Sequence, residues 1–127
     1  MRGTAISYFG GVDGETDKCT NAYAPGLSET TLTVLRATDG YVVTDNGCQV
    51  RLKLQGGILT GDDVKCDLDP ESALVKVGVL ERKYDKFRLN VVTGDFEYRF
   101  AQRQQTATAS DGVLGCYVFA GEARPVN

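Results

Sequence analysis

Apolar and polar residues alternate with a period of two in several stretches of this chain. The clearest is residues 48–54 (CQVRLKL), where every apolar or cysteine position is followed by a polar one. Alternation of the same kind recurs at residues 87–91, 96–100 and 113–120. Successive side chains of a β-strand point to opposite faces, so this pattern predicts strands that cover a core with one face only.

Turn sequences separate these stretches at short intervals. Asp45-Asn46-Gly47, Gly56-Gly57 and Thr93-Gly94-Asp95 are typical of tight connections between antiparallel strands. About eight short strands joined in this way predict an all-β fold, a small antiparallel β-barrel with mostly meander order. A two-sheet β-sandwich is the alternative. The expected strands are residues 4–9, 31–36, 41–44, 48–54, 64–68, 73–80, 87–91, 96–100 and 113–120.

Three segments lack strand periodicity within what we expect to be one domain spanning residues 1–127. Residues 12–28 are polar and rich in small side chains, and they predict a long N-terminal loop. Residues 81–86 are predicted as a charged connection whose Arg82-Lys83 pair is solvated. The tail at 121–127 is predicted to be loose. A few helical residues are expected within residues 12–28 or 69–73.

Four cysteines stand singly along the chain, at positions 19, 48, 66 and 116. If Gly56-Gly57 forms a two-residue turn, Leu54 pairs with Leu59, and a β-bulge at Gly61-Asp62 brings Cys48 opposite Cys66. The Cys48–Cys66 disulfide predicted in this way leaves Cys19–Cys116 as the second. Two disulfides place the chain in a secreted, periplasmic or cell-surface location, reached through a signal peptide that has been removed. Four buried free thiols in a cytosolic protein are the alternative.

Charge and composition narrow the partners of the 127-residue chain. Its formal net charge is −3 and no stretch is densely basic, which argues against nucleic acid because phosphate binding needs clustered Lys and Arg. No segment approaches the roughly 18 to 20 apolar residues of a transmembrane helix. The paired glycines fit no phosphate loop, so no cofactor is predicted.

The sequence contains no histidine, which excludes Ser-His and Cys-His nucleophile pairs and a histidine general base. A carboxylate pair for glycoside cleavage remains as the enzymatic alternative, and we predict that the chain is not an enzyme. Asp13, Glu15 and Asp17 alternate as calcium ligands do at the start of an EF-hand loop. They lack the glycine and the distal glutamate of that motif, so no metal site is assigned.

These features favour a non-catalytic binding module that recognises a protein partner through loops at one barrel end, in an inhibitor-like or adhesin-like accessory role. Exposed tyrosines suit protein recognition, and the predicted site comprises Tyr23, Pro25, Leu27 and Tyr41. Compact disulfide-bonded barrels of this size resemble small secreted protease inhibitors and lipocalin-like binders in architecture, without a shared motif. The alternatives are a carrier of a small apolar ligand and a structural subunit of an envelope or surface assembly. The oligomeric state is left open.

Overall fold

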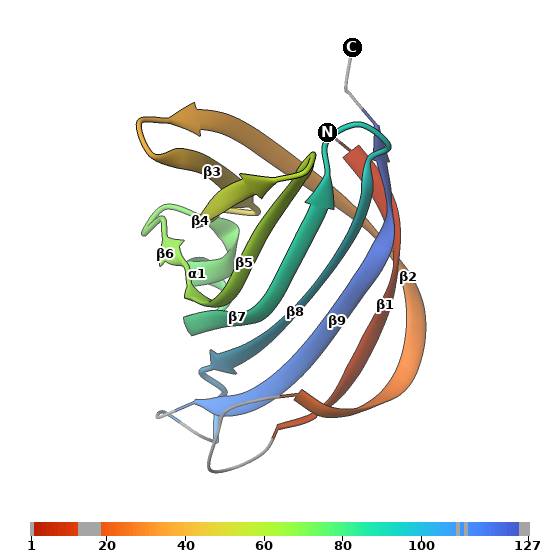
Figure 1. Cartoon of the computed structure of the whole chain (residues 1–127). Helices are drawn as coiled ribbons and strands as arrows, with labels where there is room; N and C mark the ends of the chain where they lie inside the picture. Colours follow the sequence, from red (N-terminus) through yellow and green to blue (C-terminus); the bar gives the residue numbers. More distant parts are fainter. Residues whose placement is uncertain (1, 13–18, 109, 111, 125–127) are drawn as a thin grey trace.

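A computed structural model describes residues 2–12, 19–108, 110 and 112–124; at residues 2, 4–12, 19–25, 28 and 113 it describes the backbone only. Nearly all of this chain is antiparallel β-structure, as predicted (Figure 1). The elements are β1 (Arg2–Val12), β2 (Cys19–Ala37), β3 (Gly40–Asp45), β4 (Cys48–Gln55), β5 (Ile58–Lys65), β6 (Asp67–Leu68), α1 (Ala73–Lys76), β7 (Val79–Asn90), β8 (Asp95–Gln104) and β9 (Val113–Arg124).

The strands form one curled sheet with the order β3-β2-β1-β9-β8-β7-β5-β4-β6. Seven of them make a half-barrel, and β3 pairs with both β2 and β4. Strand pairing therefore continues from β2 through β3 to β4. Neighbours in the sheet are mostly neighbours in sequence, with β6 and α1 inserted between β5 and β7. The predicted antiparallel barrel with meander order is confirmed.

The core lies on the inner face of the curled sheet. The alternation seen at residues 48–54 has the predicted sense at Cys48, Val50 and Leu52, which are buried, but not at Leu54, which is 44% exposed near the end of β4. Aromatic side chains of β7 and β8 fill the neighbouring space, and the rings of Phe87 and Tyr98 stack with their centroids 4.9 Å apart. The buried apolar residues of the core cluster are Leu32, Val43, Cys48, Val50, Leu52, Leu59, Cys66, Tyr84, Phe87, Leu89, Phe96, Tyr98, Phe100 and Ala123.

Two segments predicted to lie outside strands are paired. The loop predicted at residues 12–28 is wrong at both ends, because β1 runs through Val12 and the 19-residue β2 begins at Cys19. Its small and polar residues hide the strand, which forms because β1 offers a partner along its length. The tail predicted at 121–127 is wrong for residues 121–124, which belong to β9 and pair with β1.

The stretch from residue 73 to residue 86 also differs from the prediction. Ser72 accepts a hydrogen bond from the Val75 N–H and begins a short helix where a strand was expected. The helix is followed by Gly78, whose φ of +97° suits glycine. Strand β7 then starts at Val79 and includes the predicted charged connection at 81–86, because β5 and β8 pair with it along its two edges.

The Cys48–Cys66 disulfide is confirmed, with 5.4 Å between the two Cα atoms. Leu54 pairs with Leu59 as predicted, but β4 and β5 pair only over three residues each. On its other edge β5 pairs with β7 from Ile58 to Lys65, and its pairing with β4 ends at Thr60. The predicted bulge opposite β4 is therefore wrong, and Cys66 reaches Cys48 because β6 returns to the first residues of β4.

Cys116 is also disulfide-bonded, and no cysteine among the described residues is free. Its predicted partner is Cys19, whose side chain lies outside the described part of the chain. The Cys19–Cys116 pairing therefore stays a prediction.

Candidate functional site

Two of the four residues predicted as a binding site, Leu27 and Tyr41, lie far apart along β2 and β3. Leu27 is 78% exposed and lies in the half of β2 that pairs with β1. Tyr41 is half-buried against the core and pairs with Arg36, roughly 30 Å further along β2 in extended chain. The side chains of Tyr23 and Pro25 lie outside the described part, as do the calcium candidates Asp13, Glu15 and Asp17.

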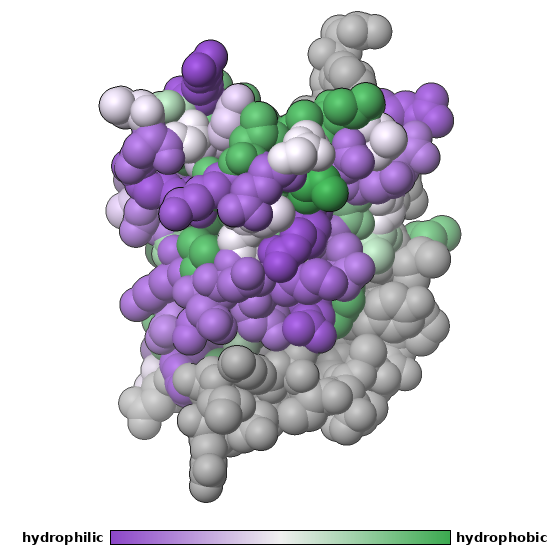
Figure 2. Space-filling model, in the orientation of Figure 1, coloured by the Kyte–Doolittle hydropathy of each residue, from purple (hydrophilic) through white to green (hydrophobic). Residues whose placement is uncertain are grey.

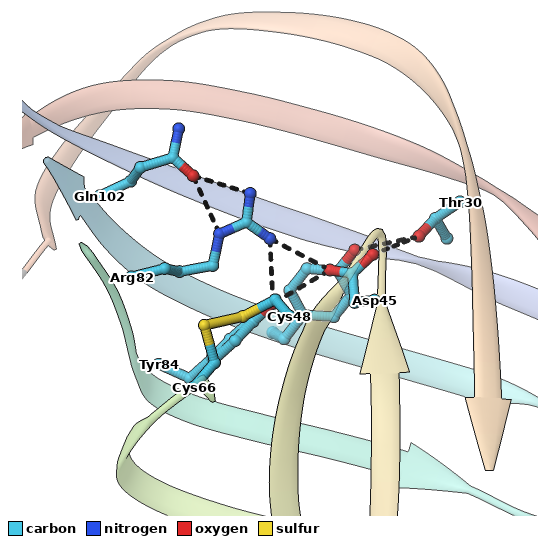
Figure 3. Close-up of polar contacts among 8 residues, drawn as sticks. Thr30, Asp45, Cys48, Cys66, Arg82, Tyr84 and Gln102 are labelled. Atoms are coloured by element: carbon cyan, nitrogen blue, oxygen red, sulfur yellow. Dashed lines mark hydrogen bonds and ion pairs between the residues drawn. A yellow bond between two sulfur atoms is a disulfide. The ribbon is translucent and has the colours of Figure 1, made fainter. Parts of the chain in front are cut away.

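A buried polar cluster crosses the inside of the barrel (Figure 3). Arg82 of β7 donates from Nε and Nη2 to Oε1 of Gln102 at 2.9 and 2.7 Å. Its Nη1 faces Oδ2 of Asp45 at 3.4 Å, and its guanidinium carbon lies 4.0 Å from the centroid of the Phe100 ring. The sequence predicted Arg82 to be solvated; its residue is 5% exposed, so this prediction is wrong.

Two phenols and a threonine complete the cluster around Asp45. Tyr84 donates to Oδ2 of Asp45 at 3.0 Å, and Thr30 donates to Oδ1 at 3.3 Å. The Thr30 hydroxyl also bonds the Tyr98 hydroxyl at 3.2 Å. Burial, and then the negative charge of Asp45, raise the pKa of Tyr84 and the pKa of Tyr98 well above their ordinary value.

The low solvent exposure of these side chains limits what the cluster can do. Arg82, Asp45, Gln102 and Thr30 are each at most 7% exposed, so solvent and ligand do not reach the charged groups. Their hydrogen bonds join β2, β3, β7 and β8 across the barrel. We assign a structural role to the cluster, because a buried charge pair whose hydrogen bonds are all formed favours one arrangement of the strands. Among the described residues no three His, Cys, Asp or Glu side chains gather as a metal site would need.

A surface depression of about 450 Å³ lies where the β3–β4 turn meets the connection that carries α1. We call it the α1 depression. One hydrogen bond and one close approach bring its walls together. The Asp69 N–H donates to the Gly47 carbonyl at 2.9 Å, and a Cβ on Gly47 would lie 2.4 Å from that of Ser72. Asn46, Gly47, Asp69, Ser72, Ala73, Leu74 and Val77 line the depression.

The lining of the α1 depression is apolar on the α1 side and acidic at one edge. Leu74 is half-buried against the core, whereas Val77 is 60% exposed. Asp69 is exposed, and its Oδ1 accepts the Glu71 N–H at 2.9 Å, which fixes the carboxylate at the rim. The sequence predicted the β3–β4 turn but not its contact with the α1 connection, because the contact depends on the path of β6.

The opposite end of the barrel also exposes apolar side chains. Val92 is 85% exposed at the tip of the β7–β8 hairpin, and Leu54 is 44% exposed near the end of β4. Figure 2 shows apolar surface at this upper end, above the hydrophilic outer face of the sheet. Val91 and Val92 line a hollow of about 390 Å³ at this end, together with the residues of the Arg124–Glu122 ion pair. We call this surface the hairpin end.

Comparisons with known proteins add no assignment: no family model, no curated protein and no solved structure matches this chain. No helix in the described ranges is long and apolar enough to cross a bilayer.

Proposed function

We propose that this chain is a non-catalytic binding module that works outside the cytosol and holds a protein partner in the α1 depression. The observation that carries the proposal is an exposed valine, Val77, beside Leu74 in a concave surface at one barrel end. Proteins bury apolar side chains in such hollows when they associate.

The contacts that hold the walls of the α1 depression together also support it as the binding surface. The β3–β4 turn and the α1 connection are joined by the Asp69–Gly47 hydrogen bond, and the Cys48–Cys66 disulfide lies where the connection begins. A preformed surface loses little conformational freedom on binding, which favours affinity. The proposal keeps the predicted binding by loops at one end of the barrel, but it assigns this binding to other residues than the sequence did.

The disulfide supports a location outside the cytosol, where such bonds persist. The lack of histidine supports a role without catalysis, because the commonest nucleophile activators are missing. Half-exposed ion pairs such as Lys86–Glu97 are typical of a solvated surface and give no second site.

Site-specific photo-cross-linking tests the proposal. A photoreactive residue is placed at position 77 or, as the matched control, at position 92, and each chain is exposed to the fluid or cell fraction that holds the natural protein. We expect a discrete adduct from position 77 that mass spectrometry identifies as one protein, and none from position 92. No adduct from position 77, or the same adduct from both positions, would overturn the proposal.

A further inference from the structure

We infer that the partner segment held by the α1 depression is a basic one, with an apolar side chain seated between Leu74 and Val77 and Lys or Arg residues beside it. This inference rests on the proposed function and adds the chemistry of the partner. It follows from charge complementarity at the rim of the depression.

The charge around the depression is mostly negative. Residues 69–76 contain two acidic residues and one lysine. Asp69 lines the depression, and Glu71, whose N–H bonds the Asp69 carboxylate, is exposed beside it. Lys76 is exposed in the last turn of α1. Asp45 below them is buried and already paired with Arg82, so it adds no accessible charge. A cationic segment is therefore attracted to this rim, and an acidic one is repelled.

The fixed position of the Asp69 carboxylate at the rim makes the attraction to a cationic segment specific. The Asp69 carboxylate is held by the Glu71 N–H, so its position is fixed before a partner arrives. The apolar floor beside it needs a side chain without charge, since burying an unpaired charge there is unfavourable. Together these surfaces fit alternating basic and apolar side chains in one short segment.

Peptide selection from a random phage library against the immobilised full chain tests the inference, with counter-selection against the Val77→Asp chain. We expect the selected peptides to be basic with at least one large apolar residue. Their binding should weaken as salt is added, because salt screens exposed charges beyond roughly 8 to 10 Å. Circular dichroism checks that each variant retains the β fold.

Two double variants separate rim charge from total charge. Asp69→Asn with Glu71→Gln should weaken a selected peptide by roughly tenfold, as expected for losing two exposed charge contacts. Glu29→Gln with Asp39→Asn removes the same net charge elsewhere on the surface and should leave binding within about twofold.

The outcomes distinguish the two proposals. Peptides that need Val77 but are acidic or uncharged, or that ignore the Asp69 and Glu71 variants, would overturn the inference and leave the proposed function standing. Peptides that bind the Val77→Asp chain equally well, or no enriched peptide at all, would overturn the inference together with the depression as a docking site.

Discussion

The guanidinium of Arg82 is shared between an amide, a carboxylate and a phenol, all inside the barrel. A buried charge of this kind is tolerated because each of its neighbours accepts a hydrogen bond or carries the opposite charge. Removing one side chain leaves at least one buried polar group without one of its hydrogen-bond partners. The consequence should be visible as a loss of stability.

Asp45→Asn tests this at the residue scale. The amide keeps the size of the side chain but leaves the Arg82 charge without its counter-charge, so the free energy of unfolding should fall by about 3 kcal/mol. Urea unfolding measures the change. Asp39→Asn is the control, because it breaks the exposed Arg51–Asp39 pair and should alter stability by less than about 1 kcal/mol. Equal effects of the two substitutions would contradict the assigned role.

Tyr84 and Tyr98 predict a loss of stability at alkaline pH. Their pKa values are raised in the folded chain, whereas an unfolded tyrosine titrates near pH 10. Below pH 10 both states hold the phenol protons and the contribution to stability is complete. Above it the unfolded state releases protons that the folded state retains, so the free energy of unfolding falls as pH rises, by up to about 1.4 kcal/mol per pH unit for each tyrosine.

Urea unfolding at a series of pH values from neutral to strongly alkaline checks this sign. In the Tyr84→Phe chain the free energy of unfolding should fall less steeply with pH above pH 10, because one of the two tyrosines no longer contributes. This variant also loses two hydrogen bonds and should be less stable at every pH. A slope equal to that of the unmodified chain would show that Tyr84 ionises alike in both states.

At single positions the sequence predicts which face of a strand is buried, but not every polar residue's surroundings. Alternation correctly places Cys48, Val50 and Leu52 inside. The same period of two places Arg82 and Tyr84 on one face, yet a buried arginine is rare enough that solvation was the natural expectation. Its partners Asp45 and Gln102 are distant in sequence, and no local pattern connects them.

Strand β6 is only two residues long, and it positions the α1 depression. It pairs with Cys48 and Gln49 of β4, directly beside the Cys48–Cys66 disulfide. Two strand residues contribute little pairing on their own. The disulfide therefore holds the start of the α1 connection against β4.

Replacing Cys48 and Cys66 together by alanine tests this role. The sequence separation of 18 residues predicts a loss of about 3 kcal/mol in the free energy of unfolding. Binding of a selected peptide should fall by at least tenfold while circular dichroism still reports a β fold, since the walls of the depression separate. Unchanged peptide affinity would show that the connection is held by other contacts.

Strands that bury one face only were predictable from the sequence. Elements whose structure depends on partners distant in sequence were not. Strands β4 and β8 follow clean alternation and were predicted to within a few residues. Strand β2 was missed over its first half, where Pro25 and Gly26 interrupt any pattern, because pairing with β1 decides its structure. Residues 73–76 read equally well as a short strand, and the Ser72 cap is the signal that was available.

Across the whole molecule, the turns divide between two ends of the barrel. The turns of β4–β5 and β7–β8 lie at the hairpin end, and the Val91 N–H donates to the Gly57 carbonyl between them. The β3–β4 turn and the α1 connection lie at the other end and form the α1 depression. Meander order was predictable from the turns, and the Cys48–Cys66 bond was predicted correctly, although through a β4–β5 register that does not occur. The meeting of separate turns in one depression was not, because it depends on how the sheet curls.

A comparison of two matched substitutions tests the central claim, that the partner docks in the α1 depression. Affinity of the cross-linked partner, once purified, is measured for the unmodified chain, for Val77→Asp and for Val92→Asp. Both valines are exposed, so both variants should fold. Binding should weaken by at least tenfold for Val77→Asp, because a charge is driven into an apolar contact, and stay unchanged for Val92→Asp. Loss of binding at Val92 with normal binding at Val77 would contradict the account and move the docking site to the hairpin end.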